Sequence, residues 1–477
     1  MPRRRIRVTG APEAPLRAAL AALRAELGLL DAFPPEARAE AERAAEAPVL
    51  PSYDATDIPF FTLDPPASTD LDQAAHLSRQ GTGYRVRYAV ADVAAFVVPG
   101  GALDAEAHRR VNTLYFPDGK VPLHPTVLSE GAASLLPHQV RPAVLWTVDL
   151  DAEGRTVAVD VRRALVRSRA RFDYAGVQRE IDAKTAEEPV ALLKEIGEAR
   201  ERQEAGRGGI SLNVPEQRIT EQDHTYVLGY RAPLPAEAWN AQLSLLTGMA
   251  AADLMLAYGT GVLRTLPAAP DGAVARLRRT ATALHIDWPH HVSYAALIRT
   301  LDPHDTHHAA FLQECTTLLR GAGYAVFRDG VLPAITTHAA VAAPYTHCTA
   351  PLRRLADRYA SEICLAAMAG QPPPDWVLTV LDALPRRMAD GARITGTVER
   401  ECVDIVEAAL LKDRVGDVFV GCVVDVDEHR PTVGTVQVDS PAVIGRVEGD
   451  RLPLGERLRV RLSRAEPGTT KILFTVA

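Results

Sequence analysis

Three aspartates lie within nine residues of one another, in a run that also contains prolines, threonines and a serine. They are Asp64, Asp70 and Asp72, and Gln73 follows the last of them. Carboxylate oxygens and waters in octahedral geometry are the ligands that Mg²⁺ prefers. Two such ions about 3.5–4 Å apart can activate a water and stabilise the leaving oxygen of a phosphodiester. The spacing fits a hard metal site, and a solvated acidic loop, which is common, fits it as well.

Arg353 is a second candidate for chemistry, because it follows the run Thr-Ala-Pro-Leu. The planar guanidinium suits a bidentate grip on a phosphate and stabilisation of developing negative charge. The alternative is a helix-surface arginine paired with Asp357, four residues further on. Taken without its wider context, Arg353 favours that alternative.

Two further groups of polar residues stand out. Five arginines fall between residues 162 and 171, and on a strand residues 163, 167, 169 and 171 would share a face. That face fits an electrostatic track for a nucleic-acid backbone or a solvated strand face equally well. Histidines cluster in residues 285–291 and 304–308, but without the HExxH spacing of a zinc site. Loop and helix-surface positions are therefore predicted for them.

The elements that position these residues mix strands and helices without a regular βαβ alternation, so an α+β fold is predicted. Residues 84–93 alternate like a half-buried strand, and residues 151–154 read as a hairpin turn. Helical periodicity is predicted for four further stretches. These are residues 186–206, 236–258, 270–320 and 352–368.

Three domains are expected from 477 residues. Residues 1–48 read as a small module of two helices, because leucines at 16, 20, 23, 27 and 30 form one apolar stripe and residues 36–47 follow as a second helix. A helix-turn-helix-like nucleic-acid reader and a packing element are equally compatible with this module. Residues 49–412 form the main domain. Residues 413–477 contain five short strand-like runs, which favours a small barrel of the OB type.

Composition excludes several classes of protein. A net charge of −7 excludes a protein that coats nucleic acid by bulk charge. Five scattered cysteines without a CxxC pair indicate reduced thiols in a cytoplasmic protein and argue against a cysteine zinc site. No window approaches the roughly 18 unbroken apolar residues of a membrane span. The basic N-terminus has no apolar core behind it, so neither a secretory signal nor a membrane partner is expected.

Four ordered segments give these residues a common context. The acidic run resembles the metal-binding motif of the ribonuclease II/R (RNB) family of 3′→5′ exoribonucleases. Residues 345–358 resemble the family's "YTHxTSPIRRYxDL" signature, and residues 88–104 and 113–129 resemble the blocks between them. Residues 399–404 fit a short motif near the end of the catalytic domain. The tail looks like the S1-type OB domain that such enzymes carry. The implied architecture is a mixed α/β RNB catalytic domain followed by a five-stranded OB-fold barrel.

The resemblance implies roles for the acidic run. Asp64, Asp70 and Asp72 would hold Mg²⁺, with Mn²⁺ as an alternative, or position its water. Asp70, Asp72 and Arg353 would be catalytic. Family members usually carry a fourth aspartate directly after the third, where this chain has Gln73. An amide oxygen can still ligate Mg²⁺, but one negative charge is missing, so weaker metal binding or a shifted metal preference is expected.

The resemblance also implies contacts with RNA. Tyr115 matches an aromatic residue that stacks on a base near the 3′ end, which is tolerant of sequence. Tyr174 and Glu399 match residues near the terminal nucleotide, where either could read the 2′-OH. Arg353 would grip the scissile phosphate, and Arg354 or Arg358 could share that contact. Leu212 stands where the family has a second stacking aromatic, and Leu246 and Thr247 stand where the family often has two acids just before Met249.

The expected function is therefore metal-dependent hydrolysis of single-stranded RNA from its 3′ end to nucleoside 5′-monophosphates. The partner is the RNA 3′ end, and a monomer without an obligate protein partner is expected. The rival hypothesis is a catalytically degenerate RNA-binding regulator, motivated by Gln73 and by the missing acids before Met249. A DNA-directed nuclease is a third hypothesis.

Overall fold

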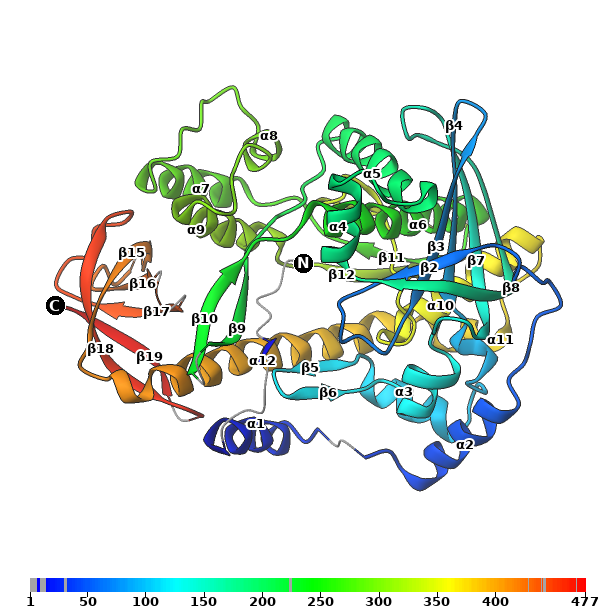
Figure 1. The fold of residues 1–477 in the computed structure, drawn as a ribbon, viewed down its shortest axis with the longest axis horizontal. Coiled ribbons are helices and arrows are strands. Elements are labelled where there is room, and N and C mark those ends of the chain that lie inside the picture. The colour runs from blue at the N-terminus through cyan, green and yellow to red at the C-terminus, as the bar shows by residue number, and fades with distance from the viewer. Residues whose placement is uncertain are drawn as a thin grey trace.

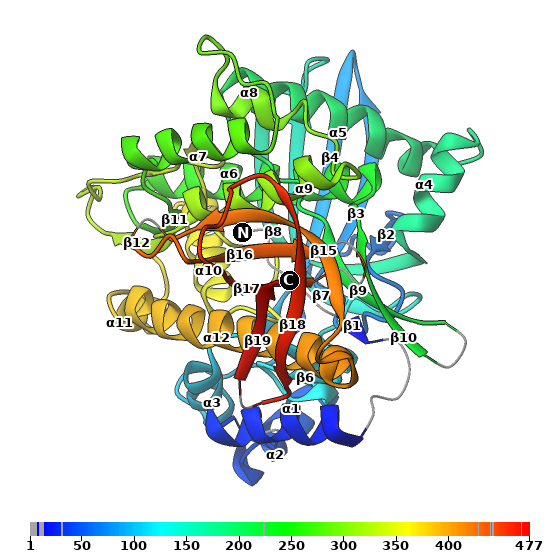
Figure 2. The same ribbon diagram turned by 90° about the vertical axis from the view of Figure 1, so that its left-hand side faces the viewer.

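A long helix links two unequal parts of the chain. The computed structural model describes residues 7–8, 14–29, 32–222, 225–427, 429–438, 440, 443–468 and 470–477. Figure 1 shows a small barrel at one end, a larger body of strands and helices at the other, and helix α12 (Leu384–Leu411) running between them. Figure 2, taken from the barrel end, shows the small barrel in front of the larger body.

A closed five-stranded barrel forms the core of the larger body. Its strands follow one another around the barrel in the order β2-β3-β4-β7-β8, and β2 closes it by pairing in parallel with β8. They are β2 (Phe60–Leu63), β3 (Gln73–Gln80), β4 (Gly83–Ala91), β7 (Val140–Leu150) and β8 (Thr156–Phe172). The alternation predicted for residues 84–93 is confirmed by β4, and the hairpin predicted at 151–154 joins β7 to β8. Trp146 and Tyr88 are buried within it.

Helices cover this barrel and build the walls around it. All four predicted helical stretches contain helices, and the long α12 was not among the predictions. The helices of this part are α3 (Ala102–Arg110), α4 (Tyr174–Asp182), α5 (Glu188–Gly206), α6 (Pro235–Tyr258), α7 (Asp271–Ala283), α8 (Tyr294–Ile298), α9 (Thr306–Cys315), α10 (Leu355–Ala369) and α11 (Asp375–Leu381). The one helix among the described residues that is long and apolar enough to cross a membrane is α6, and half of its most apolar window is buried. That burial is typical of a core helix.

Short strand pairs connect these layers. Antiparallel pairs are formed by β5 (Leu114–Phe116) with β6 (Gly119–Val121), β9 (Glu216–Gln222) with β10 (Thr225–Arg231), β11 (Gly261–Thr265) with β12 (Gly323–Phe327), and β13 (Thr337–His338) with β14 (Ala343–Pro344). The short β1 (Arg7–Val8) adds to β9 in parallel. The five cysteines are all buried and none forms a disulfide.

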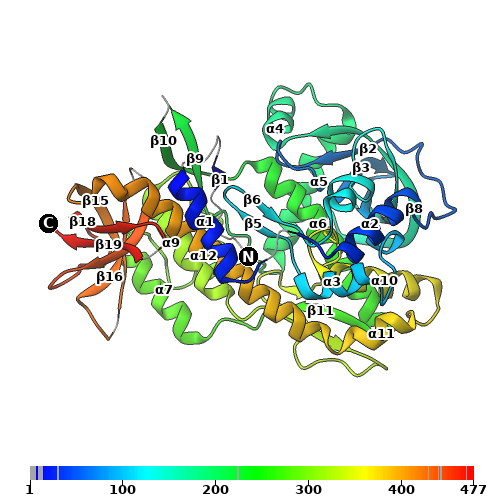
Figure 3. The ribbon, with the colours of Figure 1, turned by 90° about the horizontal axis from the view of Figure 1, so that it is seen from below.

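The two predicted N-terminal helices are present but pack on different partners. Helix α1 (Ala14–Glu26) lies against α12, whereas α2 (Pro35–Glu46) lies against α3. In Figure 3 α1 runs beside α12 and the β5–β6 hairpin, at a distance from α2. The Arg24 guanidinium of α1 pairs with Asp118 of that hairpin and stacks 4.1 Å from the centre of the Phe116 ring. The arrangement differs from a helix-turn-helix unit, in which the two helices pack on each other.

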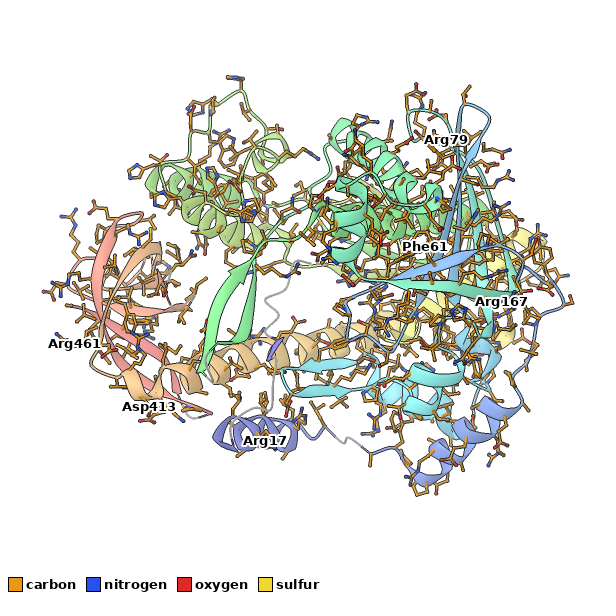
Figure 4. The ribbon with its side chains drawn as sticks, in the orientation of Figure 1. Arg17, Phe61, Arg79, Arg167, Asp413 and Arg461 are labelled. Carbon is orange, nitrogen blue, oxygen red and sulfur yellow. The ribbon has the colours of Figure 1, made fainter. Side chains whose placement is uncertain are left out.

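The C-terminal barrel matches its prediction. Five strands close in the order β15-β16-β17-β19-β18, as expected for an OB-type barrel. They are β15 (Val418–Val426), β16 (Val433–Val438), β17 (Val443–Glu448), β18 (Arg457–Glu466) and β19 (Thr470–Val476). Each contains or closely matches one of the predicted runs, because alternation of valine with polar residues is strong here. Figure 4 shows Arg461 on the outer side of this barrel and Arg79 near the tip of the β3–β4 hairpin in the larger one.

Candidate active site

The acidic run forms the connection between β2 and β3, at one end of the larger barrel. Asp64 follows β2 directly, and its amide donates to the Phe172 carbonyl over 3.2 Å. Ser134 holds the other end of the loop, since its hydroxyl accepts from the Leu71 amide (2.9 Å) and donates to the Thr69 carbonyl (2.8 Å). The loop therefore has a defined shape rather than that of a freely solvated acidic segment.

Asp72 is joined to Arg353, although the two are 281 residues apart. Arg353 Nε lies 3.1 Å from Asp72 Oδ2, and the Leu352 amide donates to Asp72 Oδ1 over 2.8 Å. Asp72 is only 4% exposed. Burial raises the pKa of Asp72 to about 7, although the Arg353 guanidinium and the Leu352 amide act in the opposite direction. The pair therefore fixes one nitrogen of Arg353 in the wall of the site.

Asp64 and Asp70 lie close enough to influence each other. Burial, and to a smaller extent the charge of Asp70, raises the pKa of Asp64 to about 6, against the lowering effect of Arg353 and Arg171. Asp70 has protein partners at both oxygens. The Tyr115 hydroxyl donates to Oδ2 over 3.2 Å, and Lys120 Nζ lies 2.9 Å from Oδ1.

Gln73 uses both ends of its amide within the protein. Its Nε2 donates to the Thr349 carbonyl, and its Oε1 accepts from the Tyr88 hydroxyl over 3.4 Å. Gln73 thus connects the acidic loop to the turn that carries Arg353. Its predicted role as a metal ligand stays a prediction, and the structure gives its side chain these other partners.

The donor chemistry at Asp64 and Asp70 fits a divalent ion. Mg²⁺ is usually bound through one or two carboxylates together with waters and substrate phosphates. Within the described ranges, no three histidine, cysteine, aspartate or glutamate side chains are grouped so as to hold a metal on their own. Asp72 is committed to Arg353 and Leu352. Asp64 and Asp70 are therefore the pair that would carry an ion, with waters and substrate completing its shell.

A cavity of about 990 Å³ reaches Tyr115 and Arg353, which are the hydrogen-bond partners of Asp70 and Asp72. It is lined by residues from β5, α5, α12 and the turn before α10, and four of the predicted RNA-binding side chains are among them. These four are Tyr115, Arg353, Arg354 and Glu399. Tyr115 is 38% exposed, which leaves its ring accessible from the cavity. The fifth predicted RNA contact, Tyr174, is not in the cavity wall.

Tyr174 lies instead on the Asp64 side of the site, as the first residue of α4. Asn240 Nδ2 donates to its hydroxyl over 3.2 Å. Burial raises the pKa of Tyr174 to about 12, and the charge of Asp64 adds to that shift. The phenol therefore keeps its proton, which is available as a hydrogen-bond donor.

The neighbouring arginines of the signature have structural partners. Arg354 donates through Nε and Nη2 to both oxygens of Asp357, at 2.9 and 2.8 Å. Asp357 is thus the partner of Arg354, and the alternative that paired Arg353 with Asp357 is wrong. Arg358 is 4% exposed and forms a buried ion pair with Asp104 at 2.6 Å. This partner and this burial favour a structural role for Arg358 over a phosphate contact shared with Arg353.

Most of the arginines of residues 162–171 are also held locally, and the exception is Arg167, whose Nε is buried without a hydrogen-bond partner. Arg163 pairs with Asp92 at 2.7 Å and with Glu362. Arg169 and Arg171 donate to backbone carbonyls of Thr56 and Pro66. These contacts tie β8 to its surroundings, so the strand face is not a row of uncommitted charges.

Two groups of residues escaped the sequence predictions. The first is Lys120, which stands directly opposite Tyr115 in the register of the β5–β6 hairpin. The other is a deep wall of the cavity made by Arg264, Tyr324 and His347, in which the Tyr324 hydroxyl and His347 Nδ1 are 2.5 Å apart. His347 belongs to the signature run of residues 345–358, but nothing local in the sequence marks Arg264 and Tyr324, which β11 and β12 bring beside it.

The sequence matches two known domain families. It matches the RNB domain over residues 52–369 and the RNase II-type exonuclease C-terminal S1 domain over residues 417–477. It is 25% identical over 475 residues to Ribonuclease R of Escherichia coli (strain K12), covering 89% of this chain and 57% of that one. It is 28% identical over 324 residues to the exosome complex exonuclease dis3 of Schizosaccharomyces pombe, covering 64% and 33%. The chain thus spans only part of the length of these curated relatives.

Solved structures with the same fold include an RNase R and a pseudonuclease. Mycoplasma genitalium RNase R in complex with ribose-methylated single-stranded RNA superposes with a TM-score of 0.82 at 20% identity, over 97% of this chain and 78% of that one. Yeast Ssd1, described as a pseudonuclease, superposes with a TM-score of 0.69 at 15% identity, over 87% and 53%. At these identities the likeness concerns the fold.

Proposed function

Because the chain belongs to the RNB family, we propose that it is a metal-dependent exoribonuclease that hydrolyses single-stranded RNA from the 3′ end to nucleoside 5′-monophosphates. The observation that carries this proposal is the placement of Arg353. Arg353 Nε donates a hydrogen bond to Asp72, and the Arg353 side chain lines the cavity of about 990 Å³ together with Tyr115 and Glu399. The Nη atoms of Arg353 are thereby left for a phosphate oxygen entering the cavity.

Arg353 is suited to the negative charge that develops on the scissile phosphate. A guanidinium held in advance stabilises such charge without reorganising during the reaction. Asp72 acts through Arg353 in this arrangement, because its two oxygens hold the Arg353 side chain and the Leu352 amide. Asp64 and Asp70 would hold a divalent ion, which would supply a more acidic water and further stabilisation of phosphate charge.

The aromatic and acidic residues of the cavity would hold the RNA end. The Tyr115 ring is exposed toward the cavity while its hydroxyl is anchored on Asp70. Stacking of a base on such a ring contributes about 1–3 kcal/mol and is independent of sequence. Glu399 in the cavity wall and the Tyr174 phenol beside Asp64 are the candidates for reading the 2′-OH.

A time course of RNA degradation tests the proposal. A 5′-labelled single-stranded RNA with a 3′ tail is incubated with the protein in Mg²⁺, in Mn²⁺ and in EDTA, beside a DNA of the same sequence. The expected result is a ladder that shortens from the 3′ end in either metal, stops in EDTA and is much slower on DNA. Asp149→Asn serves as a matched control, because Asp149 forms an ion pair with Arg85 away from the cavity.

The second candidate is a degenerate RNA-binding protein. The observation in its favour is that protein groups occupy both oxygens of Asp70 and both ends of Gln73. Intact RNA that is nevertheless retarded in a binding gel would establish this candidate and exclude the exoribonuclease. Equal degradation of RNA and DNA would instead indicate a nuclease without a 2′-OH reader.

A further inference from the structure

The β5–β6 hairpin directs two side chains at one carboxylate. In the hairpin register Tyr115 stands directly opposite Lys120, and residues in such a pair project from the same face. Both side chains reach Asp70. The Tyr115 hydroxyl donates to Asp70 Oδ2 over 3.2 Å, and Lys120 Nζ forms an ion pair with Asp70 Oδ1 at 2.9 Å. A single hairpin thus supplies partners to both oxygens of Asp70.

Lys120 has a second carboxylate within reach. Its Nζ lies 3.0 Å from Glu130 Oε1, and the side chains of Lys120 and Glu130 are 21% and 28% exposed. The Asp70 side chain is more deeply buried, at 11%. A lysine ammonium is charged at neutral pH, and that of Lys120 is within ion-pair distance of both carboxylates. Lys120 is therefore a cation with two alternative anions.

A divalent ion at Asp70 would compete with this cation. The ion needs the Asp70 oxygens that Lys120 and Tyr115 hold, and an ammonium close to these oxygens repels it. Of the other side chains in the acidic run only Asp64 is left to offset the repulsion, because the Gln73 amide is neutral and Asp72 is paired with Arg353. Glu130 can relieve this competition, because Lys120 can keep its ion pair with Glu130 while it releases Asp70 to the ion.

We propose that Lys120 is an intramolecular competitor for the divalent ion at Asp70, and that Glu130 is the carboxylate that retains its ammonium when the ion binds. The inference deepens the proposed function, since it concerns the metal of the same site. Lys120 is a positioning residue here, acting through Asp70. The hairpin that carries Tyr115 then responds to metal binding, because Tyr115 and Lys120 share Asp70.

Mn²⁺ binding to the full chain without RNA tests this proposal. The free ion is measured by electron paramagnetic resonance, so the readout does not depend on catalysis. Lys120→Met is expected to bind Mn²⁺ at least about tenfold more tightly than the unchanged chain, because a neighbouring positive charge is lost. Lys120→Arg keeps the charge and should stay within about threefold. Lys471→Met removes the same charge from the C-terminal barrel, where Lys471 pairs with Asp404, and should have no effect.

The role of Glu130 is tested by a double-mutant cycle. Glu130→Gln in the unchanged chain is expected to weaken Mn²⁺ binding about tenfold, because Lys120 then remains on Asp70. In the Lys120→Met background the same change should alter binding less than about threefold. An equal loss in both backgrounds would mean that Glu130 acts only by its own charge, and would overturn its role as the resting carboxylate.

The competition is overturned if Lys120→Met binds Mn²⁺ no better than the unchanged chain, including the case in which neither binds. Thermal unfolding of each variant, with Lys120→Gln as a second neutral replacement, confirms that the proteins compared are folded. RNA degradation by the unchanged chain is scored separately. Intact RNA with the expected order of affinities refutes the exoribonuclease alone, whereas degraded RNA with the wrong order refutes the competition alone.

Discussion

Replacement of Asp72 by asparagine separates two explanations of why this carboxylate matters. Asparagine has nearly the same shape and keeps an acceptor for the Leu352 amide, which lies 2.8 Å from Asp72 Oδ1. Its other terminal atom is then an amide nitrogen, which donates and cannot accept, so Arg353 Nε at 3.1 Å loses both the charge and the acceptor that faced it. The variant should therefore fold, because Asp72 is neutral in part of the molecules at neutral pH, where burial raises its pKa to about 7. What changes is the hold on the Arg353 guanidinium.

The expected loss follows from the strength of that contact. A hydrogen bond to a charged partner is worth about 1.5–3 kcal/mol, and asparagine offers Arg353 Nε no acceptor in its place. A loss of about 1.5–3 kcal/mol in the orientation of Arg353 corresponds to roughly a 10- to 150-fold lower rate of the chemical step. The difference between the two proteins should be largest at pH 8 and smaller at pH 6, because Asp72 of the unchanged chain gains a proton as the pH falls through about 7.

Single-turnover degradation of labelled RNA at pH 6 to 8.5 measures this loss, with Asp149→Asn as the control. RNA affinity in EDTA should change less than about threefold. Mn²⁺ affinity should also be nearly unchanged, because Asp64 and Asp70 are the proposed ligands. A loss of Mn²⁺ binding in Asp72→Asn, with normal binding in Arg353→Met, would show that Asp72 is a metal ligand and would refute the argument that it acts through Arg353.

Three other predictions concern RNA binding, pH and packing. Tyr115→Leu should weaken binding of the RNA end by about 1–3 kcal/mol in a titration with labelled RNA, and unchanged affinity would exclude stacking. Burial raises the pKa of Glu314 to about 7, although Arg276 lowers it. The folded state therefore holds this proton more tightly than the unfolded state does, and stability falls as the pH rises. Between pH 4.5 and 7 the free energy of unfolding, measured in urea, should fall by about 2–3 kcal/mol more in the unchanged chain than in Glu314→Gln. A gain over that range would contradict this sign. Gly197→Ala should lower the free energy of unfolding by at least about 1–3 kcal/mol, because the added Cβ would lie 2.4 Å from Trp239 Cβ. An unchanged melting temperature in thermal unfolding would refute this steric argument.

Local patterns in the sequence were enough for most of the elements. The leucine spacing of α1 and the alternation of β4 report which side of an element faces the core, and this depends on neighbouring residues alone. Three leucines of that stripe are buried as the spacing requires, namely Leu16, Leu20 and Leu23. The five strands of the C-terminal barrel were found for the same reason.

Local patterns could not identify what each apolar face packs against. The two N-terminal helices are close in sequence and were interpreted as one module, yet α1 packs on α12 and α2 on α3. The apolar stripe of a helix shows which face will be buried, but it does not show which other element will cover that face. The choice is made by elements that lie far along the chain, as with α12, which follows α1 by more than 350 residues.

The sequence by itself determined the chemistry that is available: three aspartates in one run, an arginine in a family signature, and an aromatic residue before a turn. The tertiary structure alone decided how these groups are paired. In the folded chain Asp72 pairs with Arg353, 281 residues away. Asp357 pairs with Arg354, and Lys120 pairs with Asp70. The physical reason is that buried charges must find partners where the fold puts them, and the order of residues along the chain does not state which ends of which elements will meet.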